Sequence, residues 1–123
     1  MQGFPLSGPR QGKIWGLTQL GFFHNSIEAH AIHVKKGGFC SCHTHKHKWN
    51  RFFVLQGKMA VRIFGDGSEV IDETVISVGQ ITDVPCGVRH EFEALEDTIA
   101  VEFYWSPLDS NDIDRMGSTG GIR

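Results

Sequence analysis

Two histidine-bearing segments, each opened by a glycine, place the strongest constraint on how this chain folds. The first spans residues 37–57 and contains the run His-Thr-His-Lys-His at 43–47, in which histidine occupies alternate positions. Because alternate side chains of an extended strand point to the same face, we expect these three imidazoles to converge. The second segment spans residues 79–90 and ends on His90 after a Pro-Cys-Gly turn. Neutral imidazoles are frequent metal ligands, so the pattern predicts a metal site closed by two strands of a β-barrel.

The rest of the sequence is a series of short apolar stretches separated by turn residues. Residues 59–64 alternate between the two faces of a strand, and Gly-Asp-Gly at 65–67 then forms a hairpin turn. Fifteen glycines, and nine Phe against one Tyr, also favour an all-β chain. No stretch has a convincing helical period, and about nine short strands with regular turns are typical of a sandwich or barrel. The predicted strands are 27–34, 39–45, 51–55, 59–64, 70–78, 81–84, 88–94 and 98–105, preceded by two short apolar stretches at 14–15 and 20–23.

Length and charge limit the kind of protein this is. A chain of 123 residues is enough for one domain, which we divide into an N-terminal arm with the first strands (1–26), a barrel core (27–105) and a polar C-terminal tail (106–123). The formal net charge is −2, so no basic surface favours nucleic acid or an anionic membrane. The absence of a secretory leader and the odd number of cysteines, three, predict a cytoplasmic protein without a disulfide framework.

The two histidine segments resemble the two motifs of the cupin superfamily in order and spacing. The first motif combines glycine, His-x-His, an acidic position and a second glycine, which correspond here to Gly37, His43, His45, Asn50 and Gly57. The second combines glycine, Pro-x-Gly and histidine, which correspond to Gly79, Pro85, Gly87 and His90. The chain therefore resembles a small single-domain, RmlC-like cupin over residues 27–105. This resemblance implies an all-β fold, a cupin-type jelly-roll β-barrel.

The resemblance also implies a set of metal ligands. His43, His45 and His90 match the histidines with which cupins hold a divalent transition metal, here Zn, Mn, Fe or Ni. The usual glutamate is replaced by Asn50, a neutral and weaker ligand, which leaves the site about one charge more positive. Asn50 is either a ligand, a hydrogen-bond donor behind the ligands or a strand residue. His47 is either a fourth nitrogen ligand or a polar residue at the mouth of the barrel.

Pocket and function are less closely defined by the sequence. Alternation places Arg62, Glu102 or Tyr104 inside the barrel in only one of two possible registers, and these three are the candidate pocket residues. The first hypothesis is a metalloenzyme, an isomerase, dioxygenase or lyase, acting on a small polar molecule such as a sugar derivative or organic acid. The alternative is a non-catalytic cupin that binds a small carbohydrate-like molecule and keeps a structural or vestigial metal site. In either case we expect a homodimer.

Overall fold

Nine β-strands are present in the part of the chain that this computed structural model describes, which is residues 10–106 with Asp112 and Ile122. Most of the predicted tail, and the arm before residue 10, lie outside the described residues. Residues 10–106 form no helix. The described chain therefore contains no helix that is long and apolar enough to cross a membrane. The strands are β1 (Arg10–Lys13), β2 (Gly16–His24), β3 (Ile27–Val34), β4 (Trp49–Gln56), β5 (Lys58–Phe64), β6 (Val70–Ser77), β7 (Ile81–Val84), β8 (His90–Ala94) and β9 (Thr98–Trp105).

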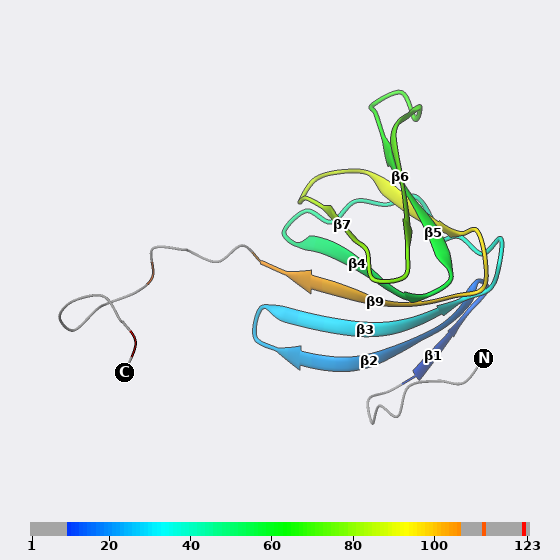
Figure 1. The fold of residues 1–123 in the computed structure, drawn as a ribbon. Helices are drawn as coiled ribbons and strands as arrows, with labels where there is room; N and C mark the ends of the chain where they lie inside the picture. The colour runs from blue at the N-terminus through cyan, green and yellow to red at the C-terminus, as the bar shows by residue number, and fades with distance from the viewer. Residues whose placement is uncertain (1–9, 107–111, 113–121, 123) are drawn as a thin grey trace.

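The strands form two antiparallel sheets that face each other. The larger sheet has the order β1-β2-β3-β9-β4-β7 and the smaller has the order β6-β5-β8. Figure 1 shows β1, β2, β3 and β9 in one layer, with β5 and β6 above them. The prediction of an all-β, jelly-roll-like fold is confirmed.

The hydrophobic core lies between the sheets because the strands alternate as the sequence predicts. Phe52 and Val54 of β4 are fully buried, whereas Arg51 and Phe53 face the other way and are half-buried. The ring of Phe52 packs against that of Phe92 on β8, with centroids 5.8 Å apart. Burying a side chain as large as Phe stabilises the folded state by about 1.5–3 kcal/mol. This contact therefore helps to hold the two sheets together.

The tight turn between β4 and β5 explains one of the motif glycines. Gly57 has a φ of +91°, a backbone conformation that side-chain-bearing residues rarely adopt. A Cβ atom at this position would approach the carbonyl oxygen of Asp97 to 2.3 Å. The second glycine of the first motif is therefore required by the backbone and not by the metal site.

Two predicted elements differ from the structure. The predicted strand 39–45 is not a regular strand, because its backbone bridges β8 only at Phe39↔Glu93 and His43↔His90. This segment leaves β3 of the large sheet, runs beside β8 of the small sheet and returns to β4. Its ladder is interrupted, so strict alternation does not extend to His47. Conversely, no strand was predicted at residues 10–13, which form an edge strand with Arg10 opposite Gln19 of β2.

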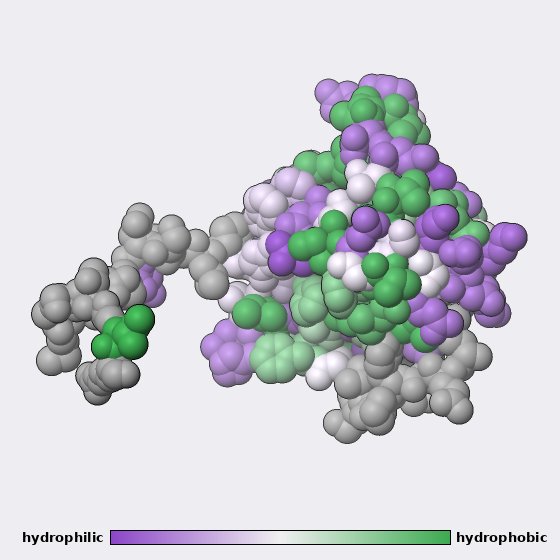
Figure 2. Space-filling model, in the orientation of Figure 1, coloured by the Kyte–Doolittle hydropathy of each residue, from purple (hydrophilic) through white to green (hydrophobic). Residues whose placement is uncertain are grey.

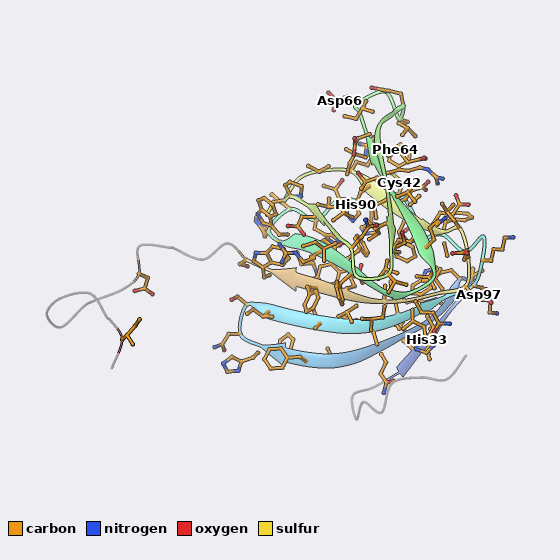
Figure 3. The ribbon with its side chains drawn as sticks, viewed as in Figure 1. His33, Cys42, Phe64, Asp66, His90 and Asp97 are labelled. Atoms are coloured by element: carbon orange, nitrogen blue, oxygen red, sulfur yellow. The ribbon has the colours of Figure 1, made fainter. Side chains whose placement is uncertain are left out.

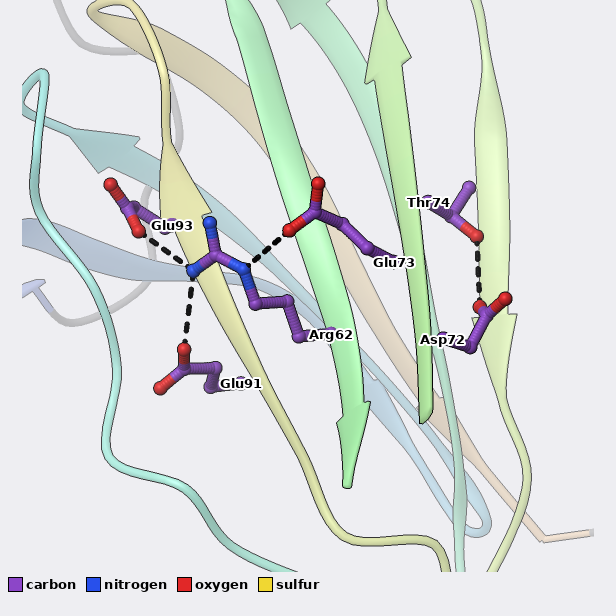
Figure 4. Close-up of polar contacts among 6 residues, drawn as sticks. All are labelled: Arg62, Asp72, Glu73, Thr74, Glu91 and Glu93. Atoms are coloured by element: carbon purple, nitrogen blue, oxygen red, sulfur yellow. Dashed lines mark hydrogen bonds and ion pairs between the residues drawn. The ribbon is translucent and has the colours of Figure 1, made fainter. Parts of the chain in front are cut away.

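Arg62 does not take the pocket position that one register of the alternation assigned to it. It lies on β5 opposite Glu73 of β6 and Glu91 of β8, on the outward face of the small sheet. Its guanidinium group contacts Glu73 at 2.8 Å, Glu91 at 3.2 Å and Glu93 at 2.7 Å (Figure 4). The inward positions on either side of this row are taken by apolar side chains such as Val61. Arg62 therefore links the three strands of the small sheet.

We expect Arg62→Met to lower the free energy of unfolding by about 1–2 kcal/mol, because it removes three partly exposed ion pairs and leaves neighbouring carboxylates to repel one another. Glu73→Gln removes only the most exposed partner and should cost less. Urea denaturation of both variants measures the difference. A variant of Arg62 that keeps full stability but loses ligand binding would place this side chain in the pocket after all.

Candidate metal centre

Three imidazoles meet between the two sheets. His90 begins β8, and the backbone bridge between His43 and His90 places the other two rings opposite it. The ring centroids are 4.7 Å apart for His43 and His45, 4.5 Å for His43 and His90, and 5.3 Å for His45 and His90. One ligand atom of each residue lies within 4.8 Å of the others. Figure 3 shows His90 between the sheets, well away from His33.

Backbone carbonyl groups orient two of these rings. His43 Nδ1 lies 2.5 Å from the carbonyl oxygen of Ser41, and His90 Nδ1 lies 3.0 Å from that of Val88. A carbonyl oxygen only accepts hydrogen bonds, so each Nδ1 carries the proton and each Nε2 keeps its lone pair. His90 Nε2 is buried and has no hydrogen-bond partner among the described residues. His43 Nε2 lies 3.1 Å from His45 Nε2, so the ring nitrogens of the group converge. Rings oriented in this way fit a metal ion, since outer hydrogen bonds of this kind fix metal-binding histidines.

The surroundings of His45 and His90 keep these two rings neutral. Burial, together with the nearby His43, Lys48 and His90, lowers the pKa of His45 to about 4. Burial also lowers the pKa of His90. Both rings are therefore uncharged at pH 7, which is the state in which an imidazole binds a metal.

The opposite wall of the site is the inner face of the large sheet. Asn50 is completely buried, and its Nδ2 donates hydrogen bonds to the Phe103 carbonyl at 3.0 Å and to Glu102 Oε2 at 3.4 Å. Its Oδ1 is buried without a partner among the described residues. Within the described chain no carboxylate joins the three-histidine group. The atoms of this group that could bind a metal ion are therefore imidazole nitrogens, and the neutral amide of Asn50 lies on the wall that faces them.

Glu102 and Tyr104 complete this wall from β9. Only 8% of Glu102 is exposed, and burial raises the pKa of its carboxyl group. The Tyr104 hydroxyl donates a hydrogen bond to this carboxyl group, and burial followed by the Glu102 charge raises the pKa of the phenol. The Tyr104 ring also contacts the His45 ring, with centroids 5.1 Å apart, and Lys48 Nζ lies 3.9 Å from its centre.

A cavity of about 860 Å³ reaches the site from the side of β1 and β2. This volume falls within the range of small-molecule sites. Trp15 and Phe92, which pack edge to face at 5.2 Å, supply an apolar part of the lining. The lining residues that concern the site are Trp15, Cys40, His43, Phe92, Glu102 and Tyr104.

The structure thus brings together some of the predicted site residues and separates others. His43, His45 and His90 form one group, and Asn50, Glu102 and Tyr104 face it from the large sheet. His47 is exposed and does not belong to the group. The sequence analysis missed Lys48, because nothing in the pattern of residues 46–48 distinguishes a lysine above a tyrosine ring from a solvated one.

Comparison with known proteins agrees with this architecture. Residues 30–107 match the model of the cupin domain family. No protein with a curated functional description matches the sequence. KdgF from Halomonas sp. has 18% identity and a TM-score of 0.69, over 81% of this chain and 89% of that one. An RmlC-like cupin from Shewanella frigidimarina has 21% identity and a TM-score of 0.66, over 90% and 94%.

A larger protein contains a similar unit. Lactobacillus farciminis oxalate decarboxylase, solved as a formate complex, has 16% identity and a TM-score of 0.70. The match covers 86% of this chain but 33% of the decarboxylase. At such identities these structural likenesses establish the fold.

We expect the metal-free protein to lose stability as the pH falls from about 6.5 towards about 4. The folded chain holds the pKa of His45 at about 4, below that of a free imidazole, so the unfolded chain binds more protons in this window. His45→Gln removes this proton uptake and should flatten the pH dependence. Urea midpoints of the EDTA-treated proteins, followed by tryptophan fluorescence, measure it. An equally steep dependence in the variant would contradict the assignment.

Proposed function

Because this chain belongs to the cupin domain family, we propose that it is a metal-binding cupin in which His43, His45 and His90 hold one divalent transition ion through Nε2. The observation that carries the proposal is the buried Nε2 of His90, which lacks a partner among the described residues while its Nδ1 is held by a carbonyl group. An unsatisfied buried polar atom costs about 1–3 kcal/mol, which a bound ion would recover. Zinc, manganese, iron or nickel bound here supplies Lewis-acid or redox chemistry.

We further propose that the protein is an enzyme acting on a small polar molecule, a sugar derivative or an organic acid, as an isomerase, dioxygenase or lyase. The cavity that reaches His43 offers such a molecule an apolar contact at Trp15 and polar groups at Glu102 and Tyr104. Burial raises the pKa of the Glu102 carboxyl group, which favours a role as a proton donor or acceptor. The likeness to a decarboxylase solved with formate supports the organic-acid class.

The alternative is a non-catalytic cupin that binds a small carbohydrate-like molecule around a structural or vestigial metal site. Asn50 favours this alternative, because an amide stands where cupins usually carry a carboxylate ligand. The Glu102 carboxyl group also already accepts hydrogen bonds from Asn50 and Tyr104, so part of its capacity is used within the protein.

We propose that the protein forms a homodimer through the outward face of the large sheet. Phe53 of β4 pairs with Ile81 of β7 and Val101 of β9, and Val101 pairs with Ala31 of β3. Paired residues share a face, so these apolar side chains form a row opposite the core. Ile81 is exposed in this row, Phe53 and Val101 are half-buried, and Ala31 is buried. A contiguous apolar surface of this kind is typical of interfaces. The three free cysteines support our inference of a cytoplasmic location.

The metal site is tested by metal analysis of the tag-free protein and of His43→Ala, His90→Ala and His24→Ala. We expect about one transition ion per native chain. Loss of a residue that only hydrogen-bonds to a ligand weakens metal affinity roughly 10–100-fold. His43→Ala and His90→Ala remove a ligand itself, so their metal affinity should fall by more than this. His24 is an exposed residue at the end of β2, so its variant should keep the metal.

His47→Ala belongs in the same series, because it decides whether the exposed His47 ligates. Full metal content in this variant excludes it as a ligand. If the native protein neither contains nor takes up a transition metal, the metalloenzyme proposal is wrong and a metal-free binding barrel remains.

The dimer is tested by Ile81→Glu, which places a charge in the outward apolar row. Ile71→Glu is the matched control, because Ile71 is also exposed but lies on β6 of the other sheet, whose hairpin with β5 projects at the top of Figure 2. We expect native protein and control at twice the 13.7 kDa chain mass by light scattering, and Ile81→Glu at the mass of one chain. A native mass of one chain would contradict the dimer.

A further inference from the structure

The histidine centre offers a divalent ion neutral ligands that do not offset its charge. The three imidazoles in reach are neutral ligands, and within the described residues no carboxylate joins them. The position where cupins usually carry glutamate is Asn50, whose amide points its Nδ2 at Glu102 and the Phe103 carbonyl. A divalent ion bound here would therefore keep its full charge of about +2, since neutral ligands do not offset it.

A positively charged side chain stands beside this centre. Lys48 is half-buried, and its ammonium group lies 3.9 Å from the centre of the Tyr104 ring, a distance that allows a cation–π interaction. The same Tyr104 ring contacts His45. Lys48 has no salt bridge with any acidic side chain of the described chain. It is thus held near His45 by an aromatic ring, with its charge uncompensated.

The nearby acidic groups do not balance this charge. Glu102 accepts hydrogen bonds from Asn50 and Tyr104, and Glu28 lies 3.0 Å from His30 Nε2. The cavity adds further positive charge, because Lys13, Lys35 and Lys36 belong to its lining. Among the described lining residues, Glu102 is the single acidic side chain. The field at the centre and along its approach therefore favours a negatively charged ligand.

We propose that the ligand of this centre is a small molecule bearing a carboxylate, and that Lys48 selects it by contacting the carboxylate beside the histidine-bound ion. A carboxylate offers one negative charge to the Lys48 ammonium group and oxygen atoms that accept its charge-assisted hydrogen bonds. This inference rests on the proposed metal site and narrows its ligand to organic acids and acidic sugars. Lys48 acts on binding and is not assigned a catalytic role.

Lactate and lactamide test the proposal, because they have nearly the same shape and differ in charge. Tag-free protein is loaded with Co²⁺, and its visible absorption bands are followed as each compound is added. We expect Lys48→Met to weaken lactate binding roughly tenfold, the effect of about one lost charge contact, and to leave lactamide binding within about twofold. Lys48→Arg should restore most of the preference for lactate.

Lys46→Met is the matched control, because Lys46 is an exposed lysine of the same segment and its loss changes the net charge equally. It should leave the binding of both compounds unchanged. If Lys46→Met weakens lactate as much as Lys48→Met does, or if neither variant changes lactate binding, the role of Lys48 is disproved while the metal site stands. If the native protein does not bind Co²⁺, the proposed metal site fails first, and this inference fails with it.

Discussion

The backbone pairing between His43 and His90 is the interaction on which the whole site depends. The two residues exchange N–H···O hydrogen bonds of 3.0 and 2.9 Å, although they lie in segments that are far apart in sequence. This bridge ties the irregular segment after β3 to the first residue of β8 and so closes the space between the sheets. It also aligns the two rings, since each Nδ1 then finds the carbonyl oxygen two residues before it. The same backbone bridge therefore connects this segment to β8 and positions two of the three histidine rings.

The polar atoms around the centre differ in how well their hydrogen-bonding capacity is satisfied. Asn50, Glu102 and Tyr104 hydrogen-bond to one another, so the large sheet presents a rigid polar wall. By contrast, Asn50 Oδ1 and His90 Nε2 are buried without partners among the described residues. Unsatisfied groups of this kind are uncommon in folded proteins and are expected to concentrate at functional sites. An ion or ligand bound at the proposed site would supply the partners that these two atoms lack.

The fold and the grouping of His43 with His45 could be predicted from the sequence because strand alternation and motif spacing are local properties of the chain. The expectation that His47 converges with them is wrong, since His47 is exposed and the third member of the group is His90. Sequence reasoning failed at 39–45 because a segment that passes from one sheet to the other makes only isolated bridges, which no local pattern reveals. It could not choose the face of Arg62, since a shift of one residue reverses every side chain of a strand and both faces of β5 were plausible. Lys48 was missed because its position depends on Tyr104, a residue that is distant in the sequence.

Replacement of the usual glutamate by Asn50 separates two roles that one carboxylate can serve. A ligating carboxylate both holds the ion and offsets its charge, whereas the amide of Asn50 does not offset charge. The nearest carboxyl group, Glu102, is one strand away on β9, where Phe52 pairs with Glu102 and Asn50 pairs with Tyr104. Burial raises the pKa of Glu102, so this group gives up negative charge more easily than an exposed acid does. The centre is consequently more positive than its acid content suggests, and a ligand must supply the missing negative charge.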